Sequence, residues 1–196
     1  MDRERFEQQV NFIREIDKEK NIFRQTHLTG HGRNENDAEH AWHMAIMAYL
    51  LREYANRGID VAKTMMMILI HDIVEIDAGD TYAYDEEAKK TQEERERRAA
   101  ERLFGMLPED QGEELKALFR EFESGETAES RFAHAMDNFQ PVILNDANEG
   151  SDWVEHGVHV GQVKKRNEIT PTGSTEIWSY MEEILKKNLE KGALLP

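Results

Sequence analysis

Three ionisable residues, His71, Asp72 and Glu75, end the most apolar segment of the chain. The segment before them, residues 65–70, reads Met-Met-Met-Ile-Leu-Ile and is apolar on all sides, which indicates a buried central helix. On a helix, His71 and Glu75 share a face, whereas Asp72 is rotated by about 100° from His71. Burial of such groups is costly unless they are paired or bound to a metal. The pattern leaves two interpretations: a helix end that emerges into solvent with a His–Asp hydrogen bond, or a metal site.

A second predicted helix adds an inward histidine, His40. It begins an apolar stripe with helical spacing that continues through Met44, Met47, Leu51 and Tyr54. A lone inward histidine is commonly a hydrogen-bonded core residue. Together with His71 and Asp72, however, His40 favours a metal site, because one ion would satisfy all three groups. His43 lies at the edge of the stripe and is expected beside the site or on the surface.

The elements that must position these residues are predicted to be helices. The chain has only 4 Pro and 12 Gly, mostly at the edges of periodic segments, and this distribution is typical of an all-α protein. At least six helices are expected, in a single domain over residues 1–196 without repeats or a long linker. Their expected bounds are residues 2–20, 37–54, 61–76, 91–104, 109–123, 127 onward, 151–166 and 175–191, with a loop over 29–34 and a kink or an end at Pro141.

Composition excludes several classes of protein. With 40 Asp and Glu against 25 Lys and Arg, the net charge is -15, which argues against binding of nucleic acid or of an anionic membrane. The absence of cysteine excludes disulfides, thiolate metal sites and a cysteine nucleophile. The charged N-terminus is unlike a signal peptide, and the run at 65–70 is too short to cross a bilayer. We therefore expect a cytoplasmic protein.

Three segments carry a family resemblance. Residues 37–43 (Asp-Ala-Glu-His-Ala-Trp-His), 71–80 (His-Asp-Ile-Val-Glu-Ile-Asp-Ala-Gly-Asp) and 135–137 (Ala-Met-Asp) resemble the HD-domain metal-dependent phosphohydrolases, and most of all their 5′-deoxynucleotidase-like branch. The resemblance covers about residues 10–145, which would form the metal-site core, with helices in 151–191 packed on it. The family pattern of one His, an adjacent His-Asp pair and a distant Asp implies four metal ligands, His40, His71, Asp72 and Asp137.

Of these four, Asp137 is the ligand that the periodicity supports least. The apolar stripe of its helix runs through Phe132, Ala135, Met136 and Phe139 and leaves Asp137 off its centre. Its assignment therefore depends on the resemblance, and Asp146 is the competing carboxylate.

The implied ligand set has a definite chemistry. Two imidazoles and two carboxylates suit one divalent ion such as Mn, Co, Fe, Zn or Mg. Four protein ligands would leave two positions of an octahedral ion for water and a phosphate oxygen, and such an ion lowers the pKa of water and polarises a phosphoryl group. The resemblance implies that Glu75 and Asp80 act on the water and the leaving group.

The resemblance also implies an arginine that binds the phosphate. Arg24 looks like the substrate-binding arginine that precedes the Glu-His segment in the family. Arg33, in a family-like Arg-x-Glu-Asn pattern, is a second candidate, which would either bind phosphate or hold the loop through Glu35. The deoxynucleotidases carry a tryptophan directly after the substrate arginine, whereas this chain has Gln25. These residues do not choose between ribose and deoxyribose.

The expected reaction is hydrolysis of a phosphomonoester, with a nucleoside or deoxynucleoside 5′-monophosphate as the substrate and a homodimer as the expected assembly. A small phosphorylated substrate also fits the strongly acidic chain better than a polynucleotide does. Three alternatives stay open, because HD domains host several activities: a phosphodiesterase, a nucleoside triphosphate phosphohydrolase, and a nucleotide-binding sensor without catalysis.

Overall fold

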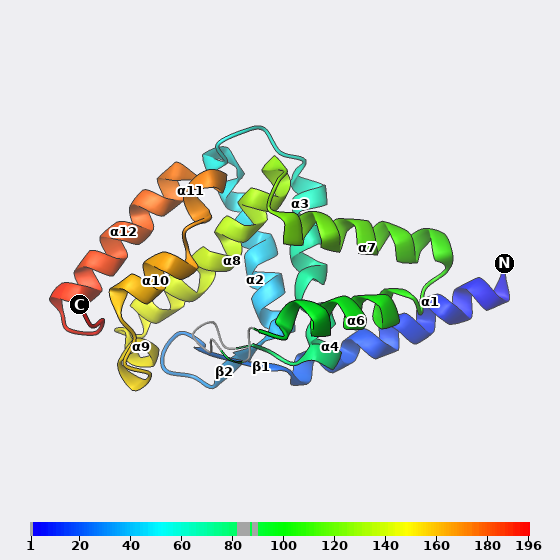
Figure 1. The fold of residues 1–196 in the computed structure, drawn as a ribbon, viewed down its shortest axis with the longest axis horizontal. Coiled ribbons are helices and arrows are strands. Elements are labelled where there is room, and N and C mark those ends of the chain that lie inside the picture. Colours follow the sequence, from blue (N-terminus) through cyan, green and yellow to red (C-terminus); the bar gives the residue numbers. More distant parts are fainter. Residues whose placement is uncertain (1, 82–86, 88–89) are drawn as a thin grey trace.

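The computed structural model describes residues 2–81, 87 and 90–196, and it is built almost wholly from helices (Figure 1). The α-helices are α1 (Arg3–Ile16), α2 (Asp37–Leu51), α3 (Val61–Ile70), α4 (Glu75–Ala78), α6 (Gln92–Phe104), α7 (Glu109–Ser124), α8 (Ala128–Ala147), α9 (Ser151–Glu155), α10 (Val160–Arg166), α11 (Thr170–Gly173) and α12 (Thr175–Glu190). Short 3-10 turns are η1 (Asp17–Asn21), η2 (Arg52–Tyr54) and η3 (His71–Val74). The all-α prediction is confirmed. In the described part of the chain, no helix combines the length and the apolar content needed to span a membrane.

Helix α8 lies at the centre of the fold and packs against α2, α3, α7, α11 and α12. Its inward residues Phe132 and Met136 are fully buried together with Met44 of α2 and Met67 of α3. A second cluster, which includes Leu103 and Phe104 of α6, joins α6 and α7 to α1 and η3. The two chain ends lie at opposite ends of the long axis (Figure 1). Because α2, α3 and α8 share one core, polar residues on their facing sides are brought together.

The predicted helix over 61–76 is broken at His71. Helix α3 ends at Ile70, the 3-10 turn η3 follows, and α4 is a single turn. Gly79, whose φ is 73°, ends α4, and its N–H donates to the carbonyl of Glu75 at 2.7 Å. A positive φ is far less costly for glycine than for other residues. The prediction of one continuous helix was therefore wrong, and the break gives His71, Asp72 and Glu75 their own tight turn.

A small hairpin stands where the sequence predicted no regular structure. Strand β1 (Phe23–His27) pairs antiparallel with β2 (Asn34–Asn36). Of the loop predicted over 29–34, residues 29–33 lie in the connection between the strands, and residue 34 begins β2. Asn36 then caps α2: its side chain accepts from the N–H of Glu39 at 2.9 Å, and Glu39 accepts from the N–H of Asn36 at 3.1 Å. The hairpin and this capping box fix the entry into α2.

Pro141 lies inside α8, which continues to Ala147. A proline within a helix removes one backbone hydrogen bond at a cost of about 3 kcal/mol. The packing of α8 against its neighbouring helices offsets that cost. Of the two predicted outcomes at Pro141, a kink or an end, the end is wrong.

Candidate metal centre

Four predicted ligands converge from α2, η3 and α8. One donor atom from each of His40, His71 and Asp72 lies within 4.8 Å of the others, and all three residues are buried. Asp137 joins them, since its Oδ1 lies 3.2 Å from Nε2 of His40 and 4.0 Å from Nε2 of His71. Nε2 of His71 in turn lies 3.0 Å from Oδ1 of Asp72. The α8 residue at this cluster is thus Asp137, whereas the competing Asp146 is bound to Lys187 at 2.7 Å.

The two histidines are oriented by hydrogen bonds on their outer nitrogens. Nδ1 of His71 donates to the carbonyl of Ile68 at 2.7 Å. Nδ1 of His40 donates to Oε1 of Gln140 at 3.0 Å and lies 3.3 Å from Oε1 of Glu35. Gln140 donates through Nε2 to Oε2 of Glu35 at 2.8 Å, which turns its oxygen toward His40. Both Nε2 atoms therefore point into the cluster as ligand atoms, an arrangement usual at metal sites.

The carboxylates in the cluster are ionised. Burial opposes ionisation of Asp72, but the charges of His71 and Arg24 lower its pKa to about 2. Burial likewise opposes ionisation of Asp137, yet the hydrogen bond with His40 and the charge of Arg166 hold its pKa well below the usual range. Two anionic carboxylates thus share one small volume with two imidazole nitrogens. That donor set fits a divalent cation.

Glu75 differs from these carboxylates. Its side chain is buried, and its Oε2 has no hydrogen-bond partner among the described residues. Burial and the charges of Asp72 and Asp37 raise the pKa of Glu75 to about 12. Asp37, at the start of α2, is itself fully buried, and its Oδ1 lies 3.5 Å from Nη1 of Arg24. This surplus of buried acid is a second reason why the cluster fits a cation.

Asp80 and Arg24 also line the cavity that opens onto the cluster. Asp80 follows Gly79 in a loop that Arg95 of α6 holds, through Nη1 to the carbonyl of Ala78 and through Nη2 to the hydroxyl of Thr81 at 2.8 Å. Burial raises the pKa of Asp80 above its ordinary value. Arg24 reaches in from β1, and its Nη1 donates to Oδ2 of Asp72 at 3.0 Å.

Arg33 is not brought to the cavity. Its guanidinium binds both carboxylate oxygens of Glu39, the residue of the capping box, and donates to the carbonyl of Asn34 at 2.8 Å. The side chain is 53% exposed. The expected contact with Glu35 is replaced by one with Glu39, because Glu35 is turned inward toward His40 and Gln140. The geometry thus argues against the predicted phosphate-binding role of Arg33 and assigns it to the entry of α2.

Sequence reasoning missed three polar residues. Gln140 and Asp37 are described above, and the third is Arg166 at the end of α10, whose Nη2 donates to Oδ2 of Asp137 at 3.2 Å. The position of Gln140, three residues after Asp137 on one helix, was a usable signal. Arg166 gave none, because it is 29 residues from its partner and ends a basic run that reads as surface.

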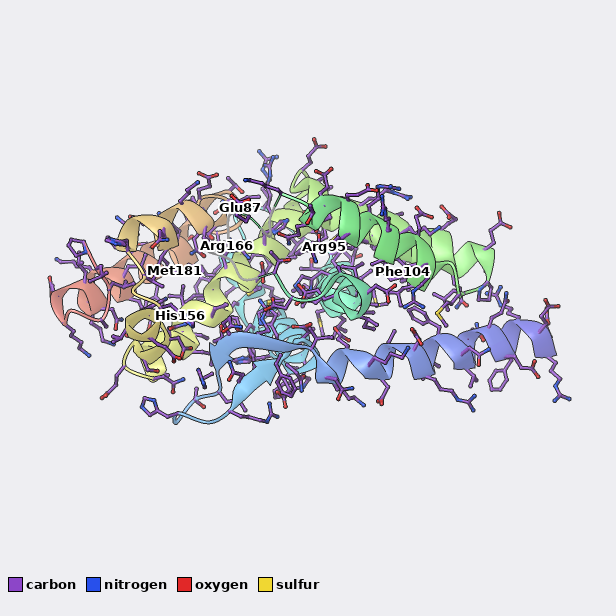
Figure 2. The ribbon with its side chains drawn as sticks, turned by 60° about the horizontal axis from the view of Figure 1, so that its bottom comes forward. Glu87, Arg95, Phe104, His156, Arg166 and Met181 are labelled. Atoms are coloured by element: carbon purple, nitrogen blue, oxygen red, sulfur yellow. The ribbon has the colours of Figure 1, made fainter. Side chains whose placement is uncertain are left out.

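The cavity has a volume of about 350 Å³ and extends from the cluster toward α9 and α10. Its far part is lined by apolar side chains, among them Trp153, Val142 and Val163, and by Asn145 and His156. Figure 2 labels His156 and Arg166 on this side of the molecule. A pocket of this size and mixed lining is suited to a small organic ligand with one charged end.

Known proteins are similar to this chain in sequence and in fold. The human 5′-deoxynucleotidase HDDC2 is 29% identical over 124 residues, which are 63% of this chain and 58% of the human protein. The 5′-deoxynucleotidase hdd1 of Schizosaccharomyces pombe is 27% identical over 112 residues, 55% of each chain. The chain therefore spans little more than half the length of these curated relatives.

Among solved structures, a predicted metal-dependent phosphohydrolase from Magnetospirillum magnetotacticum MS-1 is 48% identical. It superposes with a TM-score of 0.93, over 98% of this chain and 96% of that one. A conserved hypothetical protein from Pyrococcus furiosus shares the fold alone, at 22% identity and a TM-score of 0.59. The sequence model of the HD domain matches residues 16–178, so the match includes α9, α10 and Arg166. On this match the chain belongs to the HD domain family.

Proposed function

We propose that this protein is a metal-dependent phosphohydrolase that cleaves a phosphomonoester, with a nucleoside or deoxynucleoside 5′-monophosphate as its substrate. The observation that carries the proposal is the convergence of His40, His71, Asp72 and Asp137 at one end of a cavity that Glu75 and Asp80 also line. The names of the similar proteins, 5′-deoxynucleotidases and a predicted metal-dependent phosphohydrolase, support it.

The ligand set assigned to one divalent ion is His40, His71, Asp72 and Asp137. When bound, such an ion supplies positive charge that polarises a phosphoryl group and makes water more acidic. The choice among Mn, Co, Fe, Zn and Mg is left to experiment. The residues around the cluster carry the rest of the chemistry.

Hydrolysis forms a bond between a water oxygen and phosphorus and breaks the ester P–O bond. One proton must leave the water, and one must reach the leaving oxygen. Glu75 holds a proton at neutral pH, because burial and neighbouring acids raise its pKa to about 12, and we assign to it the donation of that proton to the leaving oxygen. We assign to Asp80 the acceptance of a proton from water, and to Arg24 the binding of the phosphate.

We assign the far part of the cavity to binding of the nucleoside. Trp153, Val142 and Val163 line it with apolar side chains, which suits the ring of a nucleoside. The net charge of -15 favours a substrate of mononucleotide size over a polynucleotide. The homodimer and the cytoplasmic location stay predictions.

Metal-dependent release of phosphate tests the proposal. The protein would be stripped with chelator, reloaded separately with Mn, Co, Mg, Fe or Zn, and given a panel of ribo- and deoxynucleoside 5′-monophosphates. We expect release that needs metal and is lost in Asp72→Ala, together with the bound ion, while the fold is kept. Stoichiometric metal in Asp72→Ala would contradict the ligand set.

The same assay separates the alternatives. Cleavage of diesters or triphosphates, without phosphate release from monophosphates, would indicate a phosphodiesterase or a triphosphate phosphohydrolase on the same site. Nucleotide binding without turnover under any metal would indicate a sensor.

A further inference from the structure

We propose that Arg166 is a second phosphate-binding residue, which contacts the phosphoryl group of the substrate from α10 while Arg24 does so from β1. The inference deepens the proposed function and rests on it for the identity of the substrate. It assigns a binding role to the C-terminal helices, which the sequence had placed outside the metal-site core.

Arg24 and Arg166 make the same kind of contact with the cluster, because each donates to one of its carboxylates. Nη1 of Arg24 lies 3.0 Å from Oδ2 of Asp72, and Oδ1 of that carboxylate faces Nε2 of His71. Nη2 of Arg166 lies 3.2 Å from Oδ2 of Asp137, and Oδ1 of that carboxylate faces Nε2 of His40. Each guanidinium therefore binds the outer oxygen of a metal-facing carboxylate. Both arginines line the cavity, so a phosphoryl group at the cluster would lie within reach of both.

Arg166 has fewer carboxylate partners than Arg24 and is more exposed. The side chain of Arg24 is 14% exposed and lies close to three carboxylates, with Asp37 at 3.5 Å and Glu35 at 3.8 Å in addition to Asp72. The side chain of Arg166 is 38% exposed, and its one partner in the described part of the chain is Asp137. Its Nε and Nη1 groups accordingly remain available to a ligand in the cavity.

The chemistry of the guanidinium selects the ligand. Its N–H groups form a planar fork that matches two oxygens of a phosphate, and it keeps its charge at any working pH. In a chain of net charge -15, an exposed cation beside the cluster also lowers the repulsion that an anionic substrate meets. A phosphate dianion is therefore the ligand that Arg166 fits.

A purely structural role would be different: Arg166 would only orient Asp137. Its loss would then weaken metal binding and leave the affinity for phosphate at saturating metal unchanged. The two roles are separable because metal and inorganic phosphate can be titrated independently.

The test compares Arg166→Gln with Lys164→Gln, a matched control that removes one exposed cation from the same helix but outside the cavity lining. Calorimetric titration of inorganic phosphate into the Mn-saturated protein gives the phosphate affinity, and titration of Mn gives the metal affinity. We expect Arg166→Gln to weaken phosphate binding about ten- to a hundredfold, the loss typical of a hydrogen bond to a charged group. Arg166→Lys should recover part of the loss, and Lys164→Gln should behave as the unmodified protein.

Wild-type affinity for phosphate in Arg166→Gln, or an equal loss in Lys164→Gln, would overturn the inference, as would an unmodified protein that binds no phosphate. The assay needs no turnover. A protein that binds phosphate but hydrolyses no monophosphate would therefore defeat the proposed function, while the variants still decide the role of Arg166.

Discussion

Two carboxyl groups one turn apart, Asp72 and Glu75, are held in opposite protonation states. Burial disfavours the charge of both. At Asp72 the positive charges of His71 and Arg24 overcome it and lower the pKa to about 2, whereas at Glu75 the charges of Asp72 and Asp37 add to it and raise the pKa to about 12. Carboxyl groups whose environments separate their pKa values in this way commonly divide the tasks of charge stabilisation and proton transfer. The geometry accordingly assigns Asp72 to binding of the metal ion and Glu75 to transfer of a proton.

Glu75→Gln tests that division. The amide keeps the size of the side chain but neither gains nor loses a proton, so we expect turnover to fall by about two to four orders of magnitude with metal content unchanged. Steady-state kinetics and metal analysis on the same preparation measure both. Asp77→Asn serves as the control, because Asp77 points to Arg102 at the surface and should leave turnover unaltered. Unchanged turnover in Glu75→Gln would remove Glu75 from the mechanism.

At the scale of elements, sequence periodicity predicted the long helices because their buried faces repeat every 3.6 residues. It failed where the backbone departs from that period. The segment at 71–74 continues an apolar helix in sequence, but the structure turns it into η3. The hairpin was missed because β1 and β2 are too short to show alternation, and Pro141 is tolerated because α8 is packed on several sides.

The residues of the candidate site likewise divide into those that the sequence could predict and those that it could not. His71, Asp72 and Glu75 are local in sequence, so their proximity follows from a single helical turn, and their motif is specific enough to indicate the family. Arg166 meets Asp137 only because α10 folds back over α8, and that contact depends on packing between distant segments. Arg33 has Glu39 as its partner instead of the expected Glu35, because Glu35 is turned inward.

Arg33→Ala tests whether Arg33 only stabilises the entry of α2 or also binds phosphate. The Arg33–Glu39 pair is exposed, so its loss should lower the free energy of unfolding by less than about 1 kcal/mol. KM for the monophosphate should stay as in the unmodified protein, since Arg33 does not line the cavity. Urea unfolding and steady-state kinetics provide the two numbers. A rise in KM of tenfold or more would restore the phosphate-binding role.

At the scale of the whole molecule, the excess of acidic residues over basic ones includes carboxyl groups that are buried in the interior. Glu19, in η1, is 7% exposed, and its Oε1 has no hydrogen-bond partner within the described residues. Burial and the charges of Asp72 and Asp37 raise the pKa of Glu19 from 4.5 to about 7. The folded protein therefore keeps a proton that the unfolded chain releases at lower pH. Stability is lost as the pH rises from about 4.5 to 7, by about 3 kcal/mol at most in the metal-free protein.

Glu19→Gln removes this titration. We expect the metal-free variant to unfold at higher urea concentration than the unmodified protein at pH 8, and the advantage to shrink steadily toward pH 5. Glu4→Gln, on the exposed first turn of α1, is the matched control and should show no such trend. A difference between Glu19→Gln and the unmodified protein that does not vary with pH would contradict the account.

Removal of the metal should destabilise the whole fold. Asp72 and Asp137 are both ionised and buried in a protein of net charge -15, and an ion that binds only the folded state offsets their repulsion. At a free ion concentration a hundred times the dissociation constant, the gain is about 2.7 kcal/mol, which corresponds to about 5–10 °C in Tm for a chain of this length. Thermal unfolding followed by circular dichroism, with chelator and then with restored Mn, measures the shift, and Asp72→Ala should show none. Equal Tm values with and without the ion would mean that His40, His71, Asp72 and Asp137 do not form a metal site, because binding to the folded state must raise Tm.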